Sequence, residues 1–240
     1  MAAKKPEENL HKDHRKRMRA RFDKEGFASF ADHNILEYLL FFSIARGDTN
    51  PTAHKLMNEF HSLYNVLTAD PEELQKVNGV GPASANLIRS VFEAGREMKI
   101  RKISEHPILR YEQLIMLATE WYGGRAEETV AIMLLDDKRS LIDIVEIARE
   151  HRIVPASYLD RILEVCEARN AAQLVLMHNH ADGIMHASDD DLYLTGNLYK
   201  ELSEKGVTLL EHLIVHEFDV ISILDESVGK PISGYAKIYY

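Results

Sequence analysis

Helical periodicity runs through the first hundred residues. In ADHNILEYLLFFSI, apolar side chains recur at intervals of three or four residues, so they fall on one face of a helix. Further along, Asp70 stands directly before Pro71, which is typical of an N-cap followed by proline in the first helical turn. These patterns predict an all-helical bundle over residues 13–103, preceded by a polar, flexible tail over residues 1–12.

The pattern changes after Gly123-Gly124 to short apolar runs that are typical of β-strands. Two such runs, Thr129–Leu135 and Ser140–Ile147, flank the polar segment DDKR and predict a β-hairpin. Other elements are expected as helices over 104–121, 155–168 and 189–205, and as strands over 173–177, 209–215 and 220–223. The chain is therefore predicted to be an α+β protein of two domains, with an α/β sheet domain over residues 104–240.

Charge divides the chain near the same place. Residues 1–104 carry 17 Lys+Arg against 14 Asp+Glu, and residues 105–240 carry 12 against 24, so the two parts have net charges of +3 and −12. The acidic part is a poor candidate for holding a phosphate backbone by itself, whereas the basic part is compatible with such a partner.

Other sequence features bear on location. No run of about 18 uncharged apolar residues occurs, so we expect no membrane span. The first 22 residues lack the apolar segment of a signal peptide, and the single Cys166 cannot form an internal disulfide. We therefore expect a cytoplasmic protein; neither its substrate nor its oligomeric state follows from the sequence.

The segment VNGVGPAS, between two predicted helices, has the spacing of a helix–hairpin–helix motif. Gly79 and Gly81 allow the backbone torsions that such a hairpin requires. The following helix would present amide N–H groups near Gly81 and Ala83 to a phosphate oxygen of DNA. The alternative is a glycine-containing turn that only packs two helices together.

A basic cluster, HRKRMRAR, begins at His14 and contains five of the 17 Lys and Arg residues of residues 1–104. Its side chains could reinforce phosphate binding by the hairpin. A basic helix is also common as a solvated face with no partner, so both interpretations remain open.

Potential metal ligands follow the apolar strand QLVL. His178 and His180 are two residues apart, so an extended segment would point both imidazoles to one side. Ser188 follows after seven intervening residues, and Asp191 comes three residues later, at the start of an acidic helix. Two imidazoles, one carboxylate and an open position for water would suit a catalytic zinc ion, and Ser188 could hydrogen-bond an oxyanion. The alternative is that these residues are loop polar groups and helix caps.

These motifs together resemble those of the RadC family, whose members combine a helix–hairpin–helix region with a C-terminal JAMM (MPN+) domain. The resemblance implies a cytidine-deaminase-like α/β/α sandwich, zinc ligands His178, His180 and Asp191 with Ser188 beside them, and hydrolysis of a peptide or isopeptide bond. The segments that carry it are HRKRMRARF, ILEYLLFFSIARGDTNPTAHKLMNEF, LTADPEELQKVNGVG, LLDDKRSLI, NAAQLVLMHNH and GVTLLEHLIV.

The chain departs from the family pattern around the expected general base. The family's glutamate position falls on Val145 by count, and the neighbouring residue is Glu146. Glu150-His151 replaces the family's Gly-Thr pair, Ala181 replaces a proline after the second histidine, and Pro155-Ala156-Ser157 replaces Pro-Arg-Glu. If Glu146 serves as general base, the protein is a zinc metallohydrolase. If it does not, the domain acts as a DNA- or protein-binding module.

Overall fold

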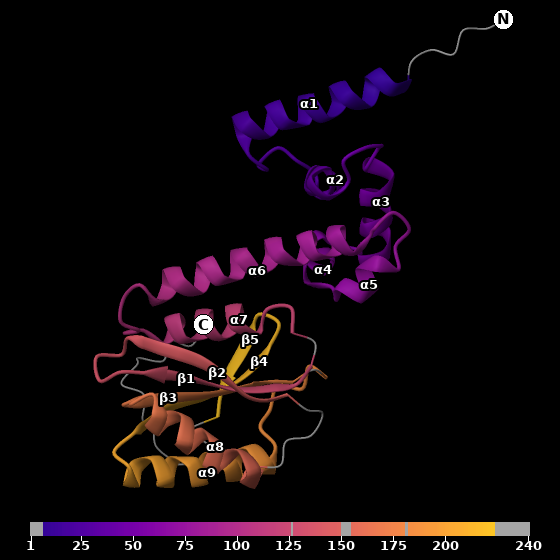
Figure 1. The fold of residues 1–240 in the computed structure, drawn as a ribbon. Coiled ribbons are helices and arrows are strands. Elements are labelled where there is room, and N and C mark those ends of the chain that lie inside the picture. Colours follow the sequence, from indigo (N-terminus) through magenta and orange to yellow (C-terminus); the bar gives the residue numbers. More distant parts are fainter. Residues whose placement is uncertain (1–6, 126, 150–154, 181, 224–240) are drawn as a thin grey trace, which may run out of the picture. The chain divides into compact units, whose positions relative to one another are not determined.

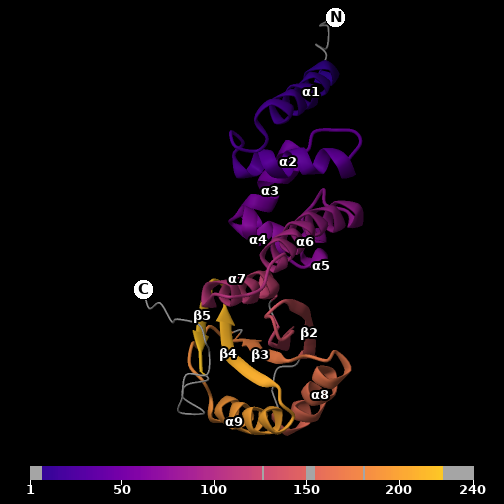
Figure 2. The same ribbon diagram turned by 90° about the vertical axis from the view of Figure 1, so that its left-hand side faces the viewer.

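A computed structural model describes residues 7–125, 127–149, 155–180 and 182–223. The chain divides into two compact units, residues 1–95 and 96–240, and each is considered by itself (Figures 1 and 2). Residues 1–6 of the expected tail lie outside the described residues. The rest of that segment belongs to the first helix, which begins at Glu7, so this part of the expected tail is helical.

The N-terminal unit consists of helices, as predicted. They are α1 (Glu7–Glu25), α2 (Asp32–Ser43), α3 (Asn50–Phe60), α4 (Leu63–Thr68), α5 (Pro71–Gln75) and the first part of α6 (Pro82–Ser104). Their main core is built from fully buried side chains that include Leu36, Leu56 and Ile88. A smaller aromatic cluster with Met18 and Tyr38 packs α1 against α2. Among the described residues, no helix has the length and hydrophobicity to cross a membrane.

The C-terminal unit contains a five-stranded mixed sheet with the strand order β2-β1-β3-β4-β5. The strands are β1 (Thr129–Leu135), β2 (Leu141–Arg149), β3 (Gln173–Asn179), β4 (Thr208–His216) and β5 (Asp219–Ser222). Strands β3 and β4 are parallel, and the other pairs are antiparallel. Parallel neighbours need a crossover between them, and α9 (Asp189–Glu204) provides it.

Helices cover both faces of the sheet, which gives the predicted three-layer α/β/α arrangement (Figure 1). Helix α7 (Tyr111–Tyr122) packs on one face through Leu114 and Leu117, against Ala131 and Met177 among others. Helices α8 (Pro155–Ala168) and α9 pack on the other face, where Val130 and Leu176 lie. We call these the α7 face and the α8/α9 face.

One predicted helix begins later than expected. The pattern indicated a helix over 104–121, but Ser104 ends α6 and α7 begins at Tyr111. Pro107 in the intervening segment has no N–H and disfavours a continuous helix. Ile108 is fully buried, and its N–H donates to the carbonyl of Arg139 at 2.8 Å, so tertiary contacts hold the connection in a non-helical form.

Candidate metal centre

The end of β3 and the start of α9 bring His178, His180 and Asp191 together. The Nε2 atoms of the two histidines are 2.9 Å apart. Asp191 Oδ1 lies 3.3 Å from His178 Nε2, and Asp191 Oδ2 lies 4.0 Å from His180 Nε2. The three side chains therefore form a set that could hold a metal ion, with ligand atoms all within 4.8 Å of one another. Within the described residues, no other group of three His, Cys, Asp or Glu side chains converges in this way.

The two histidines turn the same ring nitrogen toward the centre. His180 Nδ1 hydrogen-bonds the carbonyl oxygen of Ile184, which can only accept, so the ring hydrogen is on Nδ1. Its Nε2 lone pair therefore points into the space shared with His178 Nε2 and Asp191, where a cation could accept it. His178 Nδ1 is engaged with His212 Nε2 at 2.9 Å, which likewise leaves Nε2 facing the centre. A cation between these nitrogens and the carboxylate would satisfy all three groups, so the donor set fits a metal.

Burial keeps the His178 imidazole neutral. Its side chain is 2% exposed, and this desolvation lowers the pKa of His178 from its usual 6.5 to about 4, although Asp191 opposes the shift. A low pKa means that the imidazole is neutral near pH 7, and metals bind the neutral imidazole.

Asp191 is oriented by the cap of α9. Ser188 is the N-cap residue, and both its backbone N–H and its hydroxyl donate to Asp191 Oδ2, at 2.8 and 2.6 Å. The Asp191 N–H in turn donates to Ser188 Oγ at 3.2 Å, which completes a capping box. In this geometry the Ser188 hydrogen is used on the carboxylate, so Ser188 positions Asp191 and does not point that hydrogen at an oxyanion.

Two buried residues that the sequence reasoning did not select complete the surroundings of His178. They are His212, on β4, and Thr195, one turn after Asp191 on α9, and both are at most 1% exposed. One signal was present: His212 interrupts the apolar strand LLEHLIV on the same side as Leu176 of β3. A polar residue at such a position needs a hydrogen-bond partner.

Glu146 lies on the opposite face of the sheet from this centre. It pairs with Ala131 on β1, and Ala131 belongs to the α7 face. His178 pairs with Val130, which belongs to the α8/α9 face. The structure therefore does not bring Glu146 to the histidines, contrary to the role expected for it as a general base. The reason is the alternation of side chains along a strand, which sends adjacent residues to opposite faces.

Val145 occupies the face on which the glutamate was expected. It packs against the α8/α9 core, as Ala148 does. A β-bulge between Val130 and Ala131 shifts the register of β1 against β2, but it falls beyond Glu146 and leaves that residue on the α7 face. Glu150, His151 and Ala181 lie outside the described residues, and α8 begins at Pro155.

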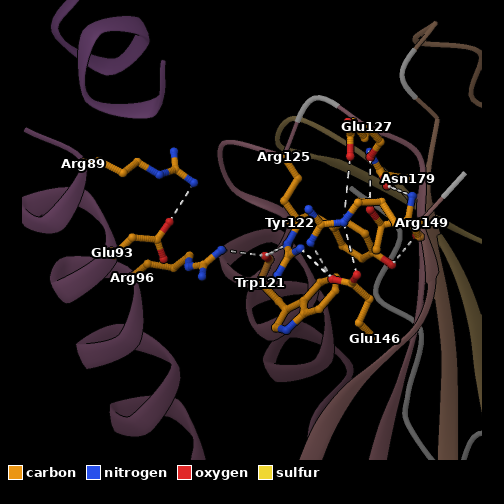
Figure 3. Close-up of polar contacts among 11 residues, drawn as sticks. Arg89, Glu93, Arg96, Trp121, Tyr122, Arg125, Glu127, Glu146, Arg149 and Asn179 are labelled. Carbon is orange, nitrogen blue, oxygen red and sulfur yellow. Dashed lines mark hydrogen bonds and ion pairs between the residues drawn. The ribbon is translucent and has the colours of Figure 1, made fainter. Parts of the chain in front are cut away.

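Two arginines hold the Glu146 carboxylate in place (Figure 3). Arg149 donates to both carboxylate oxygens, at 3.1 and 2.8 Å, and Arg125 donates to Oε2 at 3.0 Å. The Arg125 guanidinium also lies 3.8 Å from the centre of the Trp121 ring. These cations, Arg149 most strongly, lower the pKa of Glu146 below its usual value. Glu146 is therefore charged and engaged at neutral pH.

Replacing Glu146 with glutamine is expected to reduce the free energy of unfolding by about 1 kcal/mol at pH 7, because the pair is partly exposed. The folded-state pKa of Glu146 is depressed, so its stabilisation is present above the unfolded pKa of about 4.3 and is lost as pH falls through the folded value. Urea unfolding at pH 7 and at about pH 3.5 measures this difference. The control is Glu127→Gln, since Glu127 is 63% exposed and 3.8 Å from Arg149. An equal loss at both pH values would contradict the ion-pair interpretation.

The predicted hairpin lies in the N-terminal unit, between α5 and the first turn of α6. Its residues Gly79, Gly81 and Ala83 are all exposed. Val77 and Val80 on either side are buried and anchor the hairpin. Gly79 has a φ of +104°, and a Cβ there would lie 2.6 Å from Thr52 Oγ1. The backbone at this position therefore requires glycine.

Comparison with known proteins finds a match for each half of the chain. The family described as the RadC-like JAB domain matches residues 108–228, and the helix-hairpin-helix motif matches residues 49–100. The chain belongs to the RadC family.

Relatives of this RadC-family protein match it over most of their length. A UPF0758 protein of Ruegeria pomeroyi is 32% identical over 209 residues, which is 85% of this chain and 92% of the relative. A UPF0758 protein of Fusobacterium nucleatum is 28% identical over 92% of this chain and 99% of its own length. A third, from Rhodobacter capsulatus, is 30% identical over 82% and 93%. The RadC-family assignment thus extends over both units and confirms the resemblance inferred from the motifs.

Proposed function

We propose that this RadC-family protein binds zinc at His178, His180 and Asp191 and recognises a partner there without hydrolysing it. The N-terminal unit would hold nucleic acid. The observation that carries the proposal is the direction of two neighbouring side chains on β2. Val145 faces the side of the sheet on which the ligands lie, and Glu146 faces away.

Zinc is the metal that this donor set favours. Two imidazoles and one carboxylate form a common three-ligand zinc site with an open position. The ligand nitrogens are already oriented, because Ile184 and His212 engage the Nδ1 atoms of the two histidines. Ser188 orients the carboxylate of Asp191 in the same way. Zinc at such a site can polarise a carbonyl group and activate water for hydrolysis.

Hydrolysis would also need a group that moves a proton beside the metal. A carboxylate at position 145 would point from β2 to the ligand face, but valine has no such group. Glu146 is held on the other face by Arg125 and Arg149, and the alternation of the strand keeps it there. The chain thus has the residues to bind a metal and to orient its ligands, while the position expected for the proton carrier is apolar.

The test is a hydrolysis assay of the zinc-loaded full-length protein on a panel of peptides and isopeptide-linked peptides. We expect no cleavage above that of the same protein treated with a chelator. Glu146→Gln serves as the matched variant and should bind one zinc ion per chain, as the unmodified protein does. Cleavage that requires zinc would overturn the non-hydrolytic role. If Glu146→Gln then abolished it, Glu146 would be restored as the base.

The N-terminal unit supports a second part of the proposal, non-specific binding to a nucleic-acid backbone. The match to a helix-hairpin-helix motif covers this hairpin. Exposed Gly81 and Ala83 flank Pro82, the first residue of α6, and amide groups at the start of a helix suit a phosphate. Beside the hairpin, Lys55 and Lys76 line a cavity of about 340 Å³ together with Asn58, Glu59, Val77 and Asn78. Two lysines beside this part of the hairpin would add favourable charge for phosphate.

We expect the full-length protein to bind duplex DNA with an affinity that falls as salt rises. The double variant Lys55→Ala/Lys76→Ala should reduce the slope of log K against log salt by roughly 1 for each phosphate that is no longer neutralised. Fluorescence anisotropy at several salt concentrations measures the slope. Lys200→Ala, an exposed lysine on α9, is the matched control and should leave it unchanged. Absence of binding at low salt would reduce the hairpin to a structural turn.

A further inference from the structure

We infer that Thr195 and His212 are positioning residues that fix the ring hydrogen of His178 on Nδ1 and so keep its Nε2 lone pair directed at the metal position. This inference rests on the proposed zinc site and deepens it. It assigns a role to two residues that contact no metal themselves.

The four residues form one continuous line of hydrogen bonds. His178 Nδ1 lies 2.9 Å from His212 Nε2, and His212 Nδ1 lies 2.5 Å from Thr195 Oγ1. Thr195 Oγ1 donates to the backbone carbonyl oxygen of Asp191 at 2.6 Å. All four residues are at most 5% exposed. Because water is excluded from buried groups, these contacts determine where the hydrogens of His212 and Thr195 lie.

Which atom donates in each of these hydrogen bonds follows from the last of them, between Thr195 and Asp191. A carbonyl oxygen only accepts, so the single hydrogen of the Thr195 hydroxyl is used on Asp191. The contact with His212 Nδ1 must then use a hydrogen on that nitrogen. His212 is 1% exposed, and its two ring nitrogens contact a hydroxyl and another imidazole, so a charged ring there would be a buried charge without a counter-ion among its contacts. The neutral ring, with its hydrogen on Nδ1, has a bare Nε2. That atom accepts the Nδ1 hydrogen of His178.

This direction matters for the metal because a neutral imidazole has one hydrogen and one lone pair. With hydrogen on Nδ1, His178 presents a lone pair at Nε2, 3.3 Å from Asp191 Oδ1. The opposite direction, with Thr195 donating to His212, would place a hydrogen on His178 Nε2 and block it. Helix α9 therefore contributes twice: its Asp191 side chain is a ligand, and its Asp191 carbonyl sets the direction of the line that orients His178.

The first measurement uses the metal-free full-length protein, so it does not depend on zinc binding. Long-range ¹H–¹⁵N NMR spectra distinguish the two tautomers of a histidine ring. We expect hydrogen on Nδ1 for both His178 and His212. Thr195→Ser keeps the hydroxyl and should preserve this pattern. Thr195→Val has nearly the same shape without the hydroxyl, and it should lose the single tautomer. Hydrogen on His178 Nε2 in the unmodified protein would overturn the inference.

The second measurement is zinc affinity by competition with a chelating dye. Thr195→Val should bind zinc about 10- to 100-fold more weakly, as loss of an outer-shell partner does, whereas Thr195→Ser should remain near the unmodified protein. Equal affinities for the serine and valine variants would contradict the role of the hydroxyl. A second pair of variants, at His212, makes the same comparison in case the Thr195 variants misfold. His212→Gln offers His178 an acceptor oxygen and should keep more of the zinc affinity than His212→Leu, which offers none. If the tautomers are as expected but the unmodified protein binds no zinc, the zinc site fails while the hydrogen-bond direction stands.

Discussion

Replacing His180 with alanine is expected to lower zinc affinity by more than about 100-fold, beyond the range typical of outer-shell changes. In the proposed zinc site His180 supplies one of three ligand atoms, and its side chain is the least buried of the three, at 17% exposure. Its removal leaves no deep cavity, so the fold should survive the change while the metal set is reduced to His178 and Asp191. Zinc content after gel filtration and competition titration both measure the effect.

The matched control is His186→Ala in the same loop. His186 is exposed and does not belong to the converging ligand set. We therefore expect His186→Ala to bind zinc as the unmodified protein does. Comparable losses for the two variants would mean that the loop as a whole, rather than His180, determines binding. Undiminished zinc binding by His180→Ala would remove His180 from the ligand set.

Replacing Gly79 with alanine is expected to destabilise the N-terminal unit by about 2 kcal/mol. The φ of +104° is unfavourable for any residue with a Cβ, and the added atom would lie 2.6 Å from Thr52 Oγ1. Thr52 is only 8% exposed, so it has little room to move away. Thermal unfolding followed by the helical circular dichroism signal should show a midpoint lowered by roughly 10 °C.

Gly81→Ala separates this conformational requirement from any role in binding. A Cβ at Gly81 would meet no heavy atom within 4 Å, and its φ is not in the left-handed region. We expect stability to change by less than about 0.5 kcal/mol, the usual range for surface sites. If the hairpin contacts phosphate closely, DNA affinity should nevertheless fall, because a methyl group would stand at the approach to the first turn of α6. Equal stability losses at Gly79 and Gly81 would contradict the distinction.

The sequence predicted most of the elements and the three side chains of the proposed metal site. Periods of three to four residues predicted the helical half because a buried helix face imposes that period, and short apolar runs predicted the buried strands of the sheet half. The spacing of His178 and His180 along an extended segment was sufficient to place both imidazoles on one side. For Ser188 the sequence predicted an oxyanion contact and left helix capping as the alternative, and the structure has Ser188 as the N-cap of α9.

The tertiary structure decided which side chains meet across elements. By sequence position, Glu146 is one residue from the position expected for the general base. Only the pairing of β2 with β1 showed that its side chain points to the α7 face. His212 and Thr195 are 17 positions apart and meet because α9 packs on the face of the sheet to which His212 of β4 points. Ligand spacing is a local property of one strand, so the sequence determined it. The proton carrier and the residues that orient the ligands depend on register and packing between distant segments, which only the folded chain defines.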